Sequence, residues 1–399
     1  MEKEILKEIK MDKKHQKHVK LTRPDYGIFG RNEWAIIGTP CGAIQQLAYQ
    51  LTERLSSKYK VAYVDADHKS ADEEAAKGKD KNTAMAYGAT LEYTDKITFH
   101  RFDLEAKLDS YQFRQHFNEQ DLVLVNGNHF TAKKQIVILD PRKEVSLSKK
   151  LDRLTNVALI LTTTSKSEIY PFLKEHLENP EEIPVLSINQ LDEIAAFLNK
   201  KMELARAPLF GLVLAGGKSQ RMGKDKGTIN YHGKAQREYA ADLLEKYCEK
   251  TFMSIRTNQI DNIDSHYGLL VDTFEGLGPY GAILSAFREY PNHAWLVVAC
   301  DLPLLDDVSL KQLVTSRNSS RIATAFNSPV NEFPEPLIAI WEPRSYPVLL
   351  QFLAQGYSCP RKVLINSDIK LIDAVRPEAL MNVNNPEEVQ QAKDLIKNN

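Results

Sequence analysis

Short apolar runs alternate with amphipathic stretches from Glu33 onward. Between the runs, apolar residues recur at the three- and four-residue spacing of a helix, as in residues 44–55. This alternation predicts an α/β domain with a largely parallel sheet. The buried strands expected in this part are residues 34–38, 61–65, 121–126, 135–140, 157–162 and 184–188.

The stretch 65–93 breaks this pattern because it is polar and rich in Lys, Asp and Ala. We expect it to form a surface excursion or a helix outside the core. Residues 191–206 then read as a helix, and residues 208–217 (PLFGLVLAGG) read as a new first strand that ends in a glycine pair.

We therefore expect a charged leader over 1–32, one domain over 33–205 and a second over 206–399. A helix is expected over 237–249, with Ala240, Leu243, Leu244 and Tyr247 on one face. The strands expected in the second domain are residues 210–214, 252–255, 294–300, 322–326 and 335–341.

Composition narrows the class of protein. The 399 residues carry a net charge of −1, which argues against a nucleic-acid or membrane partner for the whole chain. The four cysteines form no CxxC pair, and no run of 18 or more apolar residues exists. The N-terminus lacks the apolar region of a signal peptide, so we expect a cytoplasmic protein.

A glycine-rich string follows the first strand of the second domain. Residues 214–226 read LAGGKSQRMGKDK. Glycines let the backbone approach a phosphate chain closely, and successive N–H groups in such a loop bind anions. Four cations, Lys218, Arg221, Lys224 and Lys226, lie within nine residues, so the string predicts a triphosphate site.

The string resembles LAGGxSxRMGxDK, the signature of the molybdenum cofactor guanylyltransferases, at every fixed position. The resemblance covers residues 208–399, and the later motifs of this family occur in order at 271–283, 300–305, 335–341 and 381–387. It implies a Rossmann-like nucleotidyltransferase fold. It also implies that GMP passes from GTP to the molybdopterin cofactor, that pyrophosphate leaves and that Mg²⁺ assists.

The resemblance also implies roles for particular residues. Asp301, which follows an apolar strand, would bind Mg²⁺, while Lys226 and Arg221 would act as catalytic cations on the phosphates. Asp272 would bind the nucleotide near the base or the ribose. The backbone contacts to the base would come from Leu214, Ala215, Gly216 and Gly217, and the acceptor contacts from Asn382 and Asn384.

Two residues depart from the pattern of this family, and several of the candidate site residues have an alternative structural explanation. Arg256 stands where many members of the family have Asn, and Tyr280 stands where relatives often have Leu. Lys218 and Lys224 are as well explained as solvated loop charges, and the Asn residues before Pro386 also suit a helix N-terminus.

The first domain carries a degenerate phosphate-binding loop. A working loop reads GxxxxGK[ST], but on alignment at Gly42 this chain has Ile37, Ala43 and Ile44 at the first Gly, the Lys and the Ser/Thr. Residues 33–200 resemble the P-loop accessory protein of molybdenum cofactor guanylation, with Asn126 replacing an acid. We expect no hydrolysis there. The expected role is docking of the acceptor, a molybdoenzyme or cofactor-synthesis protein, or a second copy of the chain.

Two rival functions are considered. One is a related nucleotidyltransferase that uses CTP or a sugar-phosphate acceptor, and the other is a non-catalytic nucleotide sensor. The Ala215-Gly216-Gly217 sequence favours GTP over CTP, because cytidylyl relatives tend to have Ala-Ala-Gly there. Intact Lys226 and Asp301 favour an enzyme over a sensor. The expected partners are GTP and the molybdopterin cofactor.

Overall fold

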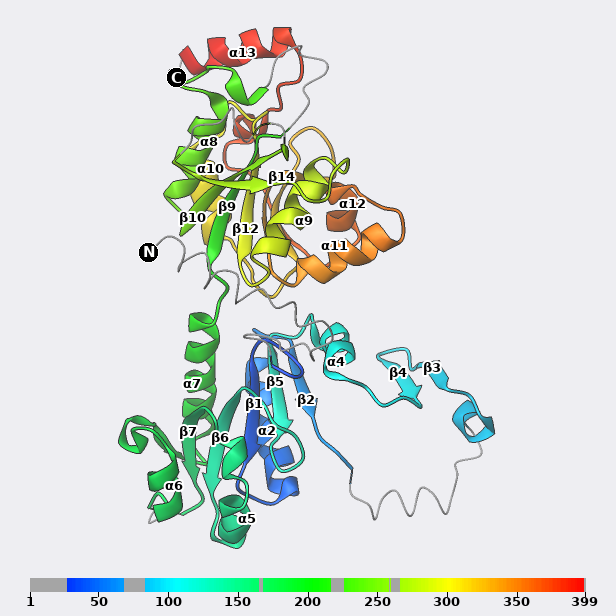
Figure 1. The fold of residues 1–399 in the computed structure, drawn as a ribbon, viewed down its shortest axis with the longest axis vertical. Helices are drawn as coiled ribbons and strands as arrows, with labels where there is room; N and C mark the ends of the chain where they lie inside the picture. The colour runs from blue at the N-terminus through cyan, green and yellow to red at the C-terminus, as the bar shows by residue number, and fades with distance from the viewer. Residues whose placement is uncertain are drawn as a thin grey trace, which may run out of the picture. The chain divides into compact units, whose positions relative to one another are not determined.

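The computed structural model describes residues 27–67, 83–164, 168–216, 226–257, 259 and 266–397. The protein is α/β with two compact units (Figure 1). The first unit comprises Met1–Gln50, Ala62–Arg114 and Leu122–Gln190; the second comprises Leu51–Val61, Gln115–Asp121 and Leu191–Asn399. None of the described helices is both long and apolar enough to cross a membrane.

A six-stranded sheet in the order β2-β5-β1-β6-β7-β8 forms the centre of the first unit. β1 pairs in parallel with β5 and β6, and β7 pairs in parallel with β6 and β8. Each expected strand is present within a residue or two. The strands are β1 (Glu33–Ile37), β2 (Val61–Val64), β5 (Leu122–Asn126), β6 (Lys134–Leu139), β7 (Val157–Thr162) and β8 (Val185–Ser187).

The helices of this region begin with α2 (Cys41–Leu55), whose apolar face is buried at Ile44, Leu47, Ala48 and Leu51. This is the face that the helical spacing predicts. The helices that follow are short. They are α4 (Ser110–Phe117), α5 (Glu144–Ser148) and α6 (Pro171–His176).

A two-stranded hairpin was not expected from the sequence. β3 (Leu91–Asp95) pairs antiparallel with β4 (His100–Leu104), so residues 91–93 form part of a strand and not the helix that was one alternative for 65–93. The hairpin lies outside the core, because its apolar residues remain more than 40% exposed at Leu91, Tyr93, Phe102 and Leu104. A burial-based pattern therefore gives only a weak signal for these strands.

The second unit contains a mixed seven-stranded sheet in the order β11-β10-β9-β12-β14-β13-β15. Its parallel part joins β11, β10, β9 and β12, and β14 runs antiparallel to both β12 and β13. The sequence pattern missed β11 and β15, which are only four and three residues long. The strands are β9 (Leu209–Leu214), β10 (Lys250–Ile255), β11 (Gly268–Val271), β12 (Ala294–Ala299), β13 (Ala323–Asn327), β14 (Pro334–Trp341) and β15 (Lys370–Ile372).

Helices cover both faces of this sheet (Figure 1). α8 (Gln236–Glu245) and α10 (Asp307–Thr315) pack into one apolar core, and α8 ends earlier than expected. The opposite core contains α9 (Pro279–Glu289), α11 (Ser345–Ala354) and α12 (Pro360–Ile365). α7 (Leu191–Leu204) and α13 (Pro386–Lys397) belong to the same unit.

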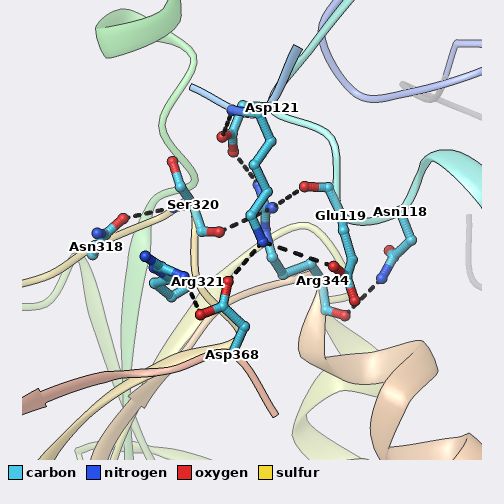
Figure 2. Close-up of polar contacts among 9 residues, drawn as sticks. Asn118, Glu119, Asp121, Asn318, Ser320, Arg321, Arg344 and Asp368 are labelled. Atoms are coloured by element: carbon cyan, nitrogen blue, oxygen red, sulfur yellow. Dashed lines mark hydrogen bonds and ion pairs between the residues drawn. The ribbon is translucent and has the colours of Figure 1, made fainter. Parts of the chain in front are cut away.

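Two short segments of the second unit, Leu51–Val61 and Gln115–Asp121, form ion pairs with residues of its longest segment, Leu191–Asn399 (Figure 2). Arg344 forms a largely buried pair with Asp121, and its guanidinium also donates to the carbonyl oxygen of Glu119 at 2.6 Å. Lys60 Nζ lies 2.8 Å from Asp368 Oδ2. These contacts fix the segments to the end of the sheet that carries Arg344 and Asp368.

Candidate active site

A cavity of about 270 Å³ opens at the carboxyl ends of the parallel strands in the second unit. Strand ends that meet at one sheet edge are where open α/β folds bind ligands. The cavity brings together six of the residues singled out in the sequence. Its lining consists of Leu214, Ala215, Gly216, Lys226, Gly227, Ser254, Asp272, Gly278, Pro279, Ala282, Ala299, Cys300, Asp301 and Leu337.

Asp301 lies just beyond the end of β12. Burial raises the pKa of its carboxyl, and the ammonium of Lys226 opposes this effect. Oδ2 lies 3.8 Å from Lys226 Nζ, whereas Oδ1 is buried and has no hydrogen-bond partner among the described residues. A buried carboxylate oxygen without a partner is costly, and a bound cation would compensate it.

Lys226 begins a single 3-10 turn over Lys226–Thr228. Its ammonium donates a hydrogen bond to Asn384 Oδ1 at 2.8 Å, besides facing Asp301. Two motifs that lie far apart in the sequence thus meet at one end of the cavity. This arrangement can neutralise the charge of a phosphate chain.

The segment before α13 holds Asn384 in place. Glu388 Oε1 accepts from Asn385 Nδ2 at 2.8 Å, and the N–H of Glu388 donates to Asn385 Oδ1 at 2.9 Å. Glu388 Oε2 also accepts from the N–H of Asn384. This reciprocal cap fixes the start of α13, while Val383 N–H bonds to the backbone oxygen of Asp301 at 2.8 Å. Asn382 is exposed.

Asp272 and Ser254 lie at another part of the cavity wall. Ser254 Oγ donates to Asp272 Oδ1 at 2.6 Å, and Asp272 N–H donates to the carbonyl of Ile255 at 2.9 Å. Burial raises the pKa of the Asp272 carboxyl, an effect that the Ser254 hydrogen bond and Arg256 oppose. Sequence reasoning missed Ser254; its only signal is a hydroxyl within the apolar strand β10.

The departure at Tyr280 is accommodated by the fold. The ring is fully buried, and its hydroxyl donates to the carbonyl oxygen of Leu349 at 2.6 Å. Burial raises the pKa of this hydroxyl to about 12. The buried polar atom therefore has a partner, and Tyr280 serves packing beside the turn at Gly278 and Pro279.

Not every expected site residue is brought to the cavity. Arg256 lies beside Gly216 but does not line the cavity, and its buried Nε has no partner among the described residues. Gly217 and Arg221, with Lys218 and Lys224, lie outside the described residues. Their roles remain predictions.

The first unit has its own polar contacts at the carboxyl edge of its sheet. Thr39 Oγ1 donates to Asp140 Oδ2 at 2.6 Å, and Arg142 forms a salt bridge with the same carboxylate at 2.7 Å. Asn126 Nδ2 donates to Asp65 Oδ1 at 2.8 Å. The polar groups at these strand ends thus bond in two pairs, β1 with β6 and β2 with β5.

The fold and cavity of the second unit define a nucleotidyltransferase. In agreement, the MobA-like NTP transferase domain family matches residues 211–370. A molybdenum cofactor guanylyltransferase of Pseudomonas putida is 30% identical over 195 residues, which make up 47% of this chain and 98% of that protein. The chain belongs to the molybdenum cofactor guanylyltransferase family, as the glycine-rich string predicts.

Other similar proteins match a comparable share of the chain. A molybdenum cofactor biosynthesis bifunctional protein of Synechocystis sp. is 37% identical over 196 residues, or 48% of this chain, but the match spans only 55% of that relative. The solved structure of molybdopterin-guanine dinucleotide biosynthesis protein A from Archaeoglobus fulgidus shares 20% identity and a TM-score of 0.42. That match covers 48% of this chain and 100% of the other.

Proposed function

We propose that the second unit transfers GMP from GTP to the molybdopterin cofactor and releases pyrophosphate. The observation that carries this proposal is the meeting of Lys226 and Asp301 in a cavity that also contains Asp272. Membership of the guanylyltransferase family supports the choice of nucleotide and acceptor.

In this reaction a phosphate oxygen of the acceptor attacks the α-phosphorus of GTP. A new P–O bond forms to the acceptor as the bond to the pyrophosphate oxygen breaks, so catalysis depends on positioning and charge. Lys226 would hold the phosphate chain, and its contacts with Asn384 and Asp301 fix the direction of its ammonium. Arg221 is proposed as a second phosphate contact.

The residues present fit a magnesium ion. Asp301 offers a buried oxygen without a hydrogen-bond partner, and the described residues contain no cluster of three or more His, Cys, Asp or Glu that would form an all-protein cage. Mg²⁺ typically binds one or two carboxylates, waters and substrate phosphates. When bound, it would neutralise charge on the phosphates.

The acceptor is proposed to bind beside Asn382 and Asn384. Asn384 already accepts a hydrogen bond from Lys226, and Asn382 is exposed two residues before it. An acceptor phosphate bound here would lie close to the cation that also serves GTP. This placement would bring the two reacting phosphates close together.

The first unit is proposed to be a degenerate P-loop domain that docks a partner. Its parallel sheet places β1 between β5 and β6, and the turn after β1 leads into α2. The position of the missing P-loop Ser/Thr is Ile44, which is fully buried. The docked partner would be the acceptor cofactor, a molybdoenzyme or a second copy of the chain.

The test is a transfer assay with the full chain, Mg²⁺, purified molybdopterin cofactor and each NTP in turn, with mass analysis of the product. A GMP adduct and pyrophosphate are expected with GTP. A CMP adduct formed equally well with CTP would support the related nucleotidyltransferase, and so would transfer to a sugar phosphate. Arg256 would then be the first residue to substitute. Nucleotide binding without any product would support a sensor.

A further inference from the structure

The loop that follows Asp301 is bound by two side chains that lie at and just before the start of α8. Gln236 Nε2 donates to the carbonyl oxygen of Leu302 at 3.1 Å. His232 Nε2 lies 2.8 Å from the carbonyl oxygen of Pro303. Because a carbonyl oxygen can only accept, Nε2 of the imidazole carries the proton in this contact. The two carbonyl groups directly after the carboxylate of the site therefore each have a side-chain donor.

A short turn joins these two side chains to Lys226. The N–H of Ile229 donates to the carbonyl oxygen of Lys226 at 3.3 Å, and the N–H of Gln236 donates to the carbonyl oxygen of Ile229 at 2.9 Å. Between these points Asn230 and Ala235 form an antiparallel bridge. These backbone contacts fix the position of the lysine relative to the side chains that bind the loop of the carboxylate.

The amide of Gln236 is poorly explained by packing alone. The residue is 1% exposed, and its Oε1 is buried without a hydrogen-bond partner within the described part of the chain. A buried amide with an unsatisfied oxygen is unfavourable for stability. The carbonyl oxygen of Leu302 also accepts from the N–H of Leu305 at 3.3 Å, so it would keep a partner without the glutamine. An apolar side chain of similar length would therefore fill this position without loss of stability.

We propose that Gln236 and His232 are positioning residues for Asp301. They act through the two carbonyl groups that they bind, and neither side chain lines the cavity. The gap of 3.8 Å between Lys226 Nζ and Asp301 Oδ2 is kept by these contacts rather than by a direct hydrogen bond. The inference rests on the proposed function only for the choice of Mg²⁺ and GTP as ligands.

The test compares the affinity of the full chain for GTP in excess Mg²⁺ with its affinity for GTP in EDTA, measured by calorimetry without acceptor. The ratio of the two affinities is the magnesium gain, which reports how well the protein binds the ion on the nucleotide. Asp301→Asn should abolish this gain and so identifies its source. Gln236→Met should lower the gain about 10-fold, the lower end of the usual effect of losing a residue that orients a metal ligand.

Gln135→Met is a matched control in the first unit. Gln135 is also 1% exposed, and its Nε2 donates to the carbonyl oxygen of Ala132 at 2.7 Å. Its Oε1 accepts from the N–H of Asn156 at 2.6 Å, so it has the partner that Gln236 lacks. Gln135→Met should therefore lower the thermal midpoint and leave the magnesium gain unchanged. Gln236→Met should lower the gain and leave the thermal midpoint unchanged.

A second pair of variants tests the donor of His232. The imidazole stacks on the ring of Tyr239, with centroids 3.7 Å apart. His232→Phe keeps an aromatic ring for this stack but has no donor, so the magnesium gain should fall. His232→Gln loses the ring but keeps an N–H donor, so it should recover most of the gain.

An unchanged magnesium gain in Gln236→Met would overturn the inference, because the amide would then serve packing only. Equal losses in His232→Phe and His232→Gln would also overturn it, since the stack rather than the donor would matter. A gain that survives Asp301→Asn would overturn it as well, because the ion would then be bound elsewhere. If Gln236→Met loses the gain but the wild type transfers no GMP, the proposed function fails and this inference stands.

Discussion

The ammonium of Lys226 lies 3.8 Å from the carboxylate of Asp301, although the two residues come from different motifs of the second unit. The gap is longer than a direct hydrogen bond, so the two groups attract each other without closing the space between them. An open lysine–carboxylate pair of this kind can bind a phosphate on one side and a cation on the other.

Substitution of either residue should lower the rate of transfer while the protein remains folded. Asp301→Ala should abolish magnesium-dependent transfer, because it removes the carboxylate that is proposed to bind Mg²⁺. Lys226→Ala should lower the rate roughly 10²–10³-fold, the scale for one preorganised donor. Single-turnover transfer measures both effects, with far-UV circular dichroism as the control for folding. Full activity in either variant would refute the site assignment.

Asn384 and Asn382 should respond differently to substitution. Asn384→Ala removes the acceptor that holds Lys226, so we expect a lower kcat together with a raised KM for GTP. Asn382→Ala, at the exposed neighbouring position, should raise the KM for the acceptor and leave the affinity for GTP unchanged. The measurement is steady-state kinetics with each substrate varied in turn. Identical kinetic changes in both variants would contradict separate roles.

The sequence predicts the parts of this site better than their arrangement. The strand that ends at Leu214 and the strand that precedes Asp301 are buried and regular, so the hydrophobic pattern finds them. The bond between Ser254 and Asp272 depends on the register of β10 against β11, and β11 is too short to give a clear pattern. The β3–β4 hairpin escapes notice because its apolar side chains are exposed.

Asp140 gives the first unit a pH-dependent stability. Hydrogen bonds from Arg142 hold the pKa of this carboxyl at about 2, below its ordinary value of 3.8. A depressed folded-state pKa stabilises the fold above pH 3.8, and this contribution is lost as pH falls through about 2. Arg142→Met should therefore lower the thermal midpoint at pH 7. The difference from wild type should shrink between pH 4 and pH 2, and a difference independent of pH would contradict this account.

Arg344 should stabilise the second unit far more than Arg321. The side chains of Arg344 and Asp121 are 12% and 5% exposed, so Arg344→Ala leaves a buried carboxylate without its partner. This should cost about 3–5 kcal/mol of unfolding free energy. Arg321 and Asp368 are each 40% exposed, and Arg321→Ala should cost about 0–1 kcal/mol. Urea unfolding of both variants tests the contrast, and equal losses would refute it.

The first unit should not hydrolyse nucleotide, because its loop has no charge at the position of the P-loop Lys and no oxygen ligand at the position of the Ser/Thr. Ala43 has no charge, and the N–H groups of Ala43 and Ile44 already bond to the carbonyl oxygen of Pro40 at 2.9 and 3.1 Å. P-loop catalysis depends on a Lys and Mg²⁺ to neutralise charge on the phosphates.

The assay should use the full chain, since residues 51–61 and 115–121 belong to the second unit. An Asp301→Asn background removes the transferase as a source of nucleotide turnover. No phosphate release from ATP or GTP is expected. The single substitution Ala43→Lys should not create hydrolytic activity, because the buried Ile44 still offers no oxygen to a metal. Hydrolysis by the Asp301→Asn chain would mean that the loop is aligned incorrectly or that another residue supplies the missing charge.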